Sequence, residues 1–333
     1  MNGIQAENEK WLRKINNVLK NKPSYLKGYV NYLNDTSVLT KYTYLNYTVN
    51  FINYINKDVK DIDFDDFINY FSYIEYKKNG EMTTPSYRIA QYSALKKFSK
   101  YLYASDKIKK DYMRDIKRPK FYDTQNTIKK REIGFLTKKE IEKYIDNIEF
   151  NYSDDRQRQV GECWNKRDQV IVKLFLYTGI RCSALVKLDI NNIDFNNNEL
   201  IVTDKGNKTK TFSLPDEMIN ELKEWIDLRN DILYKNNKIE EALFISNRCC
   251  RITQSSVSRV VNKYSDCIKG KHITPHKLRA TYGTQLYNST KDVYFVQECM
   301  GHSNPKTTEL YIRGKNENTK RASDIINNII NVK

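Results

Sequence analysis

The spacing of apolar residues predicts helices over most of the first third of the chain. Apolar side chains recur every three or four residues over 11–19 and again over 40–56, which is the repeat of an α-helix. A third stretch follows Asp63, a residue typical of a helix N-cap. A fourth runs over 85–102, with Pro85 near its start. We therefore expect a compact all-α module.

A polar, basic stretch over 106–135 follows, broken by Pro119 and without sustained periodicity, and it is interpreted as a linker. Thr137 and Glu140 then have the spacing of a capping box ahead of an apolar stripe, so a second domain is expected to begin there. The expected boundaries are an N-terminal helical extension at 1–23, a helical domain at 24–120, a linker at 121–134, a second domain at 135–321 and a C-terminal helix at 322–333.

The second domain is predicted to be mainly α with a small β-sheet. Strand-like runs at 199–203 and 209–214 flank DKGNK and indicate a hairpin. The apolar run at 243–246 predicts a further short strand. Helices are expected around 253–267, 275–289, 292–300 and 305–312, and the chain closes on an isoleucine stripe at 325, 326, 329 and 330.

Charge narrows the class of partner. The 57 Lys and Arg residues outnumber the 41 Asp and Glu residues, and both halves of the chain share the net charge of +16. Two basic bodies suit a polyanion such as nucleic acid, because phosphate neutralisation releases condensed counterions. A lysine-biased proteome would produce the same excess as an ordinary solvated surface. The expected nucleic-acid contacts are Arg88, Lys96, Lys97 and Lys100 on the fourth helix and Lys208 in the hairpin.

Several protein classes are disfavoured by the composition. No apolar run approaches the roughly 20 residues needed to cross a bilayer, and the first residues lack the apolar core of a signal peptide. The six cysteines show no CxxC spacing and are interpreted as reduced thiols. We therefore expect a cytoplasmic protein without a membrane partner.

The three histidines, His272, His276 and His302, lie close together near the end of the chain. His276 and Arg279 are one helical turn apart on a segment that Thr274 can cap. A guanidinium can bind two phosphate oxygens, and an imidazole can give or take a proton. Taken alone, the pair is more typical of a capped helix with incidental polar residues.

Zinc binding is not expected at these histidines. Pro275 lies between His272 and His276, and Ile273 stands where the HExxH motif needs its Glu. The cysteines are not at zinc-finger spacing either. No metal site is therefore predicted.

Three other candidate residues indicate a catalytic site only when they are considered together. Arg181 follows a Thr–Gly break and starts a helix whose positive end could face an anion. Lys205 lies in the hairpin, and Tyr311 is one of 25 tyrosines. Each alone fits an ordinary surface residue. Together with the histidines and Arg279 they supply two guanidiniums, proton-transfer groups and a phenol nucleophile, without a carboxylate cluster for Mg²⁺. This combination argues against two-metal nucleases and polymerases.

In order, these motifs closely resemble the catalytic domain of the tyrosine recombinase (phage integrase) family over residues 167–313. TGIRCSAL is similar to the first arginine motif, DKGNKTK to the β-hairpin lysine motif, HKLRATYGT to the His-x-x-Arg motif, and MGHSNPKTTELYIR to the closing histidine and tyrosine motif. Residues 24–120 are similar to the helical core-binding domain. One departure is Ala184, where the first motif usually has Glu, and it puts a contact around Arg181 in doubt.

The resemblance implies a site-specific DNA recombinase that needs neither metal nor ATP nor another cofactor. Tyr311 would attack a DNA phosphodiester and form a 3′-phosphotyrosine. Arg181 and Arg279 would clamp the non-bridging oxygens. The remaining roles would be a hydrogen bond from His302, general-acid catalysis by Lys205 and assistance to proton transfer at the tyrosine by His276.

The resemblance also implies the partners. The two domains would form a C-shaped clamp on a double-stranded recombination site, with a monomer or dimer on each site before synapsis. Strand exchange would then pass through a four-way junction in a homotetramer, where accessory DNA-bending factors can take part. The resemblance suggests that the C-terminal helix docks on a neighbouring protomer; docking on its own domain is the alternative.

The expected setting is the nucleoid of a cell that carries a bacterial, phage or mobile-element gene. Two alternatives stay open: a type IB topoisomerase with nearly the same residues, and a DNA-binding protein without catalysis.

Overall fold

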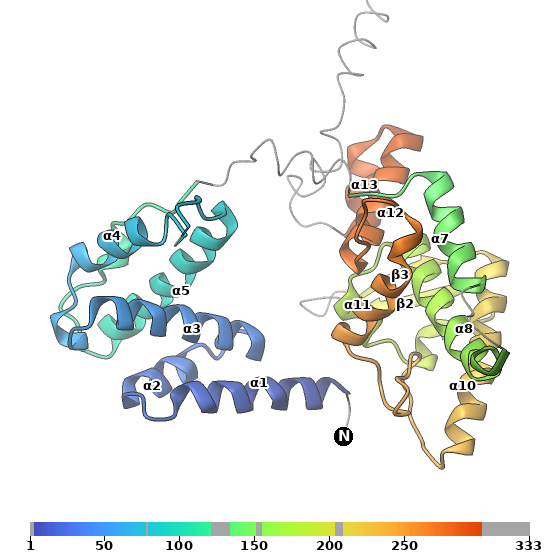
Figure 1. The fold of residues 1–333 in the computed structure, drawn as a ribbon, viewed down its shortest axis with the longest axis horizontal. Helices are drawn as coiled ribbons and strands as arrows, with labels where there is room; N and C mark the ends of the chain where they lie inside the picture. The colour runs from blue at the N-terminus through green and yellow to red at the C-terminus, as the bar shows by residue number, and fades with distance from the viewer. Residues whose placement is uncertain (1–2, 78, 121–133, 151–154, 204–208, 302–333) are drawn as a thin grey trace, which may run out of the picture. The chain divides into compact units, whose positions relative to one another are not determined.

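The computed structural model describes residues 3–77, 79–120, 134–150, 155–203 and 209–301. The chain divides into two compact units, one over Gly3–Thr124 and the other from Gln125 onward. Each unit has its own apolar core, so each has the main requirement for an independent fold. Figure 1 labels the helices and strands of both.

The first unit is all-α in the residues that the structure describes (Figure 1). Its α-helices are α1 (Gly3–Leu19), α2 (Ser24–Tyr32), α3 (Val38–Ile55), α4 (Phe64–Tyr73) and α5 (Pro85–Ala104), with short 3₁₀ turns η1 (Val59–Asp61) and η2 (Tyr112–Arg114). The periodic helices are confirmed at α1, α3, α4 and α5. Helix α2 has no predicted counterpart, although its buried residues Leu26, Tyr29 and Val30 have helical spacing.

Two predicted helix starts are confirmed by hydrogen bonds. Asp63 and Asp66 form a reciprocal capping box at α4, and each side chain accepts the other residue's backbone N–H at 3.0 Å. Pro85 is the first residue of α5, whose N-cap is Thr84. These local contacts place both helices before any tertiary packing is considered.

The linker interpretation of residues 106–120 is wrong. Ile108, Met113 and Ile116 are buried in the core of the first unit. The Tyr92 hydroxyl also donates a hydrogen bond to the Ile116 carbonyl at 2.8 Å. Three apolar side chains are enough to anchor this polar segment, although they are too few to show a periodicity. Residues 121–133 of the expected linker lie outside the described residues.

Helix α8 (Asp155–Thr178) is the central helix of the second unit (Figure 1). The helices packed against it are α7 (Lys138–Phe150), α10 (Asp216–Lys235), α11 (Gln254–Lys263) and α12 (Pro275–Thr290). The remaining helical segments are α9 (Cys182–Leu185), α13 (Val293–Met300) and the 3₁₀ turns η3 (Ile190–Asn192) and η4 (Ser265–Cys267). The predicted capping box is confirmed, since the Thr137 backbone N–H donates to Glu140 Oε2 at 2.8 Å.

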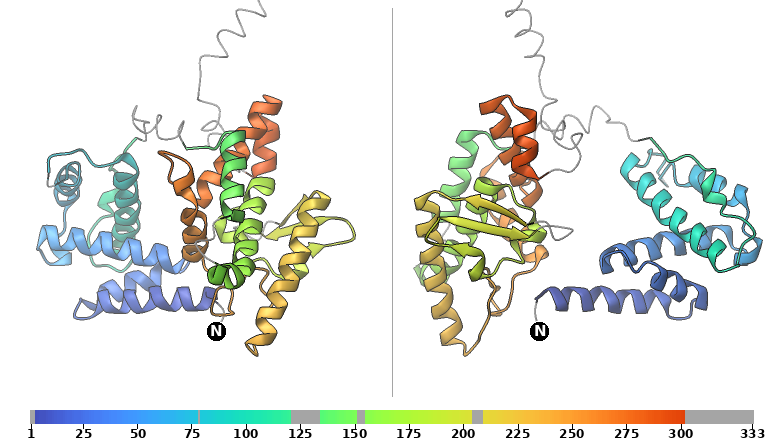
Figure 2. Two further views of the ribbon diagram at one scale, coloured as in Figure 1. Left: turned by 45° about the vertical axis from the view of Figure 1, so that its right-hand side comes forward. Right: turned by 180° about the vertical axis from the view of Figure 1, so that it is seen from behind.

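A small antiparallel sheet completes the second unit (Figure 2). Its strands are β1 (Ile193–Asp194), β2 (Glu199–Thr203) and β3 (Thr209–Ser213), in that order. The predicted hairpin is confirmed by the β2–β3 register, in which Leu200 pairs with Phe212 and Val202 with Lys210. Leu200 and Val202 are buried, so β2 turns alternate side chains toward the helices.

The strand predicted at 243–246 is wrong. Leu243, Phe244 and Ile245 are buried, but the backbone there forms only isolated bridges, one of them between Ile245 and Arg251. A fully buried apolar run looks the same whether its backbone is extended or irregular, which explains the error. The helices predicted at 305–312 and 322–333 lie outside the described residues.

The protein is thus mainly α with one small β-sheet, as expected. None of the helices within the described ranges is both long and apolar enough to cross a membrane.

Candidate active site

Arg181 lies directly after a sharp turn at the end of α8. Gly179 has a φ of +59°, a left-handed conformation that favours glycine. A Cβ atom there would lie 2.2 Å from Cδ1 of Tyr282, so the α12 ring packs tightly against this turn. Arg181 is half-buried at the N-cap of α9. Because α9 has only four residues, its dipole adds less to an anion site than the sequence pattern suggested.

Arg279 connects three of the motif segments. Its side chain extends from α12 and the residue is only 6% exposed. Nη1 donates to the carbonyl of Gly179, two residues before Arg181. Nη2 donates to the carbonyl of Met300 at 2.6 Å, two residues before His302 in the sequence. One buried guanidinium therefore joins the first arginine motif, the His-x-x-Arg motif and the end of α13.

His276 lies in the first turn of α12 and is exposed. Thr274 caps this helix and Pro275 opens it, as predicted; the Thr274 Oγ1 accepts the Lys277 backbone N–H at 3.3 Å. Partial loss of hydration and the positive charge of Arg279 both lower the pKa of His276. The imidazole is therefore neutral at neutral pH and can accept a proton.

Lys210 contacts the end of α13, although no sequence pattern pointed to it. Its ammonium Nζ donates to the carbonyls of Glu298 and Cys299 at 2.7 and 2.5 Å. Burial lowers the pKa of Lys210, and Cys299 and Glu298 oppose that shift. The DKGNKTK motif contains this lysine, but only the folded chain reveals that it reaches α13.

Several predicted site residues lie outside the described residues: Lys205, Lys208, His302 and Tyr311. Their meeting with Arg181, His276 and Arg279 therefore stays a prediction. Ala184, at the position where the family motif usually has Glu, is 3% exposed and packs in the apolar core of the second unit.

Two of the basic residues expected on α5 have carboxylate partners within the first unit. Arg88 Nη1 lies 3.1 Å from Glu75 Oε1, and the Arg88 side chain is only 13% exposed. Lys97 Nζ lies 2.9 Å from Asp35 Oδ2. These two side chains are therefore less available to an external phosphate than their sequence positions suggest. The other two, Lys96 and Lys100, are exposed.

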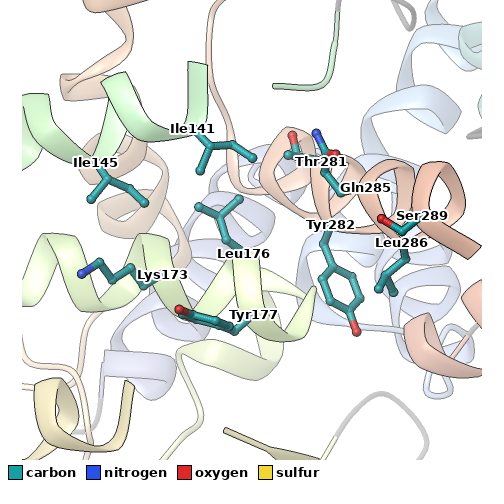
Figure 3. A pocket seen from close by; sticks show the side chains of 10 residues that line it. All are labelled: Ile141, Ile145, Lys173, Leu176, Tyr177, Thr281, Tyr282, Gln285, Leu286 and Ser289. Carbon is teal, nitrogen blue, oxygen red and sulfur yellow. The ribbon is translucent and has the colours of Figure 1, made fainter. Parts of the chain in front are cut away.

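A pocket of about 480 Å³ opens between α7, α8 and α12 (Figure 3). Ile141, Leu176 and Leu286 contribute apolar side chains to its lining. Tyr282 lines the same pocket and also packs against Gly179, so the pocket and the turn before Arg181 share a wall. Burial raises the pKa of Tyr282 to about 12, so this phenol is protonated at neutral pH.

Metal-ligating side chains do not gather in the part of the chain that the structure describes: no group of three or more His, Cys, Asp or Glu residues there could hold an ion. Two cations reach this region instead: Arg279 donates to the α8–α9 turn and to the end of α13, and Lys210 donates to the end of α13.

Comparison with known proteins places these motifs in a family context. The phage integrase family matches residues 134–318. Tyrosine recombinase XerS of Streptococcus pneumoniae (strain Hungary19A-6) is 34% identical over 191 residues, which cover 56% of this chain and 53% of that protein. Tyrosine recombinase XerC of Natranaerobius thermophilus is 30% identical over 239 residues, covering 70% of this chain and 73% of that protein. The chain spans about half the length of the streptococcal relatives it matches.

Solved structures show the same fold. The XerH site-specific recombinase bound to palindromic difH substrate superposes with a TM-score of 0.67 and 20% identity, covering 96% of each chain. A lambda integrase dimer bound to a COC′ core site gives a TM-score of 0.58 and 18% identity, covering 85% of this chain and 96% of that one. The likeness therefore extends over both units of the chain.

Proposed function

Because this chain belongs to the phage integrase family, we propose that it is a site-specific DNA recombinase that cleaves and rejoins DNA through a covalent tyrosine intermediate. The observation that carries the proposal is the buried Arg279 guanidinium, which binds the backbone beside Arg181 and the end of α13. This arrangement supports a phosphate site at the junction of the family motifs. The net charge of +16 supports DNA as the polyanion.

In the proposed reaction the Tyr311 phenol oxygen attacks the scissile phosphorus and the bond from phosphorus to the 5′-oxygen breaks. The products are a 3′-phosphotyrosine and a 5′-hydroxyl, which takes its proton from Lys205. Arg181 and Arg279 neutralise the charge on the non-bridging oxygens, and His302 adds a hydrogen bond. Attack by a 5′-hydroxyl reverses the step, so the phosphotyrosine conserves the bond energy and ATP is not needed.

His276 fits the role of proton acceptor from Tyr311. Its lowered pKa keeps the imidazole neutral near pH 7, which is the form that can take the phenolic proton. The adjacent Arg279 both lowers that pKa and belongs to the proposed phosphate clamp. The same cation would therefore tune the base and bind the reacting phosphate.

The covalent step can be tested with a nicked duplex that loses a short strand on cleavage and so traps the intermediate. Tyr311→Phe should abolish the SDS-resistant protein–DNA complex while DNA affinity stays nearly unchanged, because only one phenolic oxygen is removed. Tyr294→Phe is the matched control, since Tyr294 is 80% exposed on α13 and has no proposed role. A covalent complex with the Tyr311→Phe variant would contradict the assignment of the nucleophile.

We also propose that cleavage needs no metal ion, because two guanidiniums supply the positive charge that two-metal nucleases obtain from cations. Cleavage of the nicked duplex should therefore continue at an unchanged rate in excess EDTA. A loss of cleavage that Mg²⁺ or Zn²⁺ restores would refute this part of the mechanism.

We propose that the protein assembles as a homotetramer on two double-stranded sites and exchanges strands through a four-way junction. Each protomer would hold its duplex in a C-shaped grip. Accessory DNA-bending factors are proposed as further partners. The matching relatives named above are bacterial, so we propose action on cytoplasmic DNA from a bacterial, phage or mobile-element gene. A plasmid carrying two copies of the target should yield recombinants. Relaxation of any supercoiled plasmid without recombinants would instead favour a type IB topoisomerase.

For the isoleucine stripe at 325–330 we propose docking in the pocket between α7, α8 and α12 of a neighbouring protomer. The apolar lining of about 480 Å³ suits such a stripe, and an isolated helix of two or three turns is too short to be stable in water. Deletion of 322–333 and Leu286→Glu should each preserve single-site binding and impair synapsis. The double variant should be no worse than either alone. Normal recombination by the truncated protein would rule this docking out.

A further inference from the structure

The last turn of α13 is held by two cations from other elements. Lys210 of β3 donates to the carbonyls of Glu298 and Cys299, and Arg279 of α12 donates to the carbonyl of Met300. The final carbonyls of a helix have no partner within the helix, and its dipole favours positive charge there. Three consecutive carbonyls thus accept hydrogen bonds from side chains that are distant in sequence, although the Glu298 carbonyl also accepts the Gly301 backbone N–H at 3.1 Å.

The position of Lys210 makes this contact a link between two motif segments. Lys210 pairs with Val202, one step from the final β2–β3 pair of Thr203 and Thr209. The bond therefore anchors the hairpin beside the connection that contains Lys205. At its other end it holds α13 just before Gly301, whose φ of +61° ends the helix.

The environment of Lys210 differs from that of a solvated surface lysine. Its Nζ lies 4.9 Å from the centre of the Phe212 ring, the next side chain on the same face of β3. Lys210 is half-buried, so water does not fully hydrate its ammonium, and this burial lowers the pKa of Lys210. A partly buried ammonium is costly unless hydrogen bonds replace its hydration, and the two α13 carbonyls supply them.

We propose that Lys210 is a positioning residue for DNA cleavage, whose ammonium fixes the β2–β3 hairpin to the C-terminal end of α13. Lys205 follows β2 in the sequence, and His302 follows α13. The Lys210 side chain therefore joins the two elements from which these segments begin. This inference rests on the proposed recombinase function. Lys210 acts through these neighbours and has no assigned contact with the reacting phosphate.

The test compares Lys210→Met with Lys210→Arg and with Lys235→Met, a control at the exposed end of α10. Single-turnover cleavage of the nicked duplex is measured at saturating protein, together with DNA affinity and thermal stability. Lys210→Met should slow cleavage by about tenfold or more, but by no more than the factor of roughly 10²–10⁴ that complete loss of a general acid would cost. Arginine should restore most of the rate, because a guanidinium can also donate to both carbonyls. Lys235→Met should cleave at the normal rate.

A second substrate separates positioning from a loss of folding. It carries sulfur in place of the leaving 5′-oxygen, and a thiolate leaves without being protonated. If Lys210 acts by positioning the proposed proton donor Lys205, the loss of cleavage rate in Lys210→Met becomes several-fold smaller on this substrate. An equal defect on both substrates with a lowered Tm would show a merely structural role and overturn the proposal.

Failure of the inference can be distinguished from failure of the proposed function. Normal cleavage by Lys210→Met overturns the positioning role while the recombinase proposal stands. Absence of any covalent complex with the unaltered protein overturns both. Hydrogen exchange gives a readout that needs no activity: amides at 298–301 should exchange faster in Lys210→Met than in Lys210→Arg. Unchanged exchange would show that Lys210 does not hold this end of α13.

Discussion

At the scale of single residues, the turn before Arg181 depends on the absence of a side chain at Gly179. Its φ is +59°, and an added Cβ would lie 2.2 Å from the Tyr282 ring. Gly179→Ala should lower the free energy of unfolding by more than the about 1–3 kcal/mol that a left-handed conformation costs a non-glycine residue, because the ring must also move. Chemical denaturation followed by circular dichroism measures this loss.

Gly270→Ala is the matched control for the Gly179 variant. Gly270 also has a positive φ, +74°, but nothing lies within 4 Å of an added Cβ. Gly270→Ala should therefore lower the free energy of unfolding only by the cost of the left-handed backbone. In a Tyr282→Ala background, Gly179→Ala should also cost only that amount, because the ring that clashes with the added Cβ is gone. Equal losses at both glycines would mean that Tyr282 does not restrict the turn.

His276 offers a second prediction at the residue scale. Partial loss of hydration and the Arg279 charge place its pKa below the ordinary value of 6.5. The unfolded chain then binds this proton more readily, so protonation of His276 as the pH falls below about 6.5 works against the folded state. A proton NMR titration, with His276→Gln to assign the signal, should give a midpoint below 6.5. A midpoint at or above that value would remove the argument for a neutral base.

At the scale of elements, α8 carries a buried ion pair between adjacent residues, and each residue of the pair also binds another segment of the second unit. Arg167 Nη2 lies 2.7 Å from Asp168 Oδ1, and both residues are almost fully buried. Asp168 also accepts the Tyr264 hydroxyl at 2.9 Å, and Arg167 donates to the Ile245 carbonyl at 3.0 Å. Asp168→Ala should lower the free energy of unfolding by about 3–5 kcal/mol, because it leaves a guanidinium buried without its carboxylate.

A partly exposed ion pair between α8 and α10 provides the control for Asp168. Lys166 Nζ lies 2.5 Å from Glu224 Oε2, but the Glu224 side chain is 64% exposed. Glu224→Ala should therefore cost less than about 1 kcal/mol. Urea unfolding of both variants compares the pairs directly. Similar losses would show that burial does not set the strength of the Arg167–Asp168 pair.

At the scale of the whole molecule, the division into two units with separate cores leads us to expect that the proposed DNA binding is bivalent. Both halves carry excess positive charge. A fragment of residues 130–333 should therefore bind a target duplex more weakly than the full chain and with a shallower dependence on salt concentration, since fewer phosphates are neutralised. Fluorescence anisotropy at several salt concentrations measures both. Equal affinity and equal slope would show that the first unit does not contact DNA.

The sequence by itself determined what depends on neighbouring residues. The periodic stretches gave α1, α3, α4 and α5, since a 3.6-residue repeat reports which side of a helix is buried. The cap at Asp63 and the break at Gly179 were readable because each acts within a few residues of itself. The order of four motifs was enough to indicate the family, which the match over residues 134–318 confirms.

Only the tertiary structure decided which distant segments touch. The polar segment 106–120 joined the first core. The buried run 243–246 took an irregular backbone, in which the Leu243 N–H donates to the distant Leu188 carbonyl while Ile245 bridges to nearby Arg251. Arg279 reaches Gly179 across a hundred positions, and Lys210 reaches Cys299 across 89. Composition and periodicity indicate how buried a residue is. They do not indicate which carbonyl a guanidinium or ammonium will bind, because that depends on how the elements of the second unit pack together.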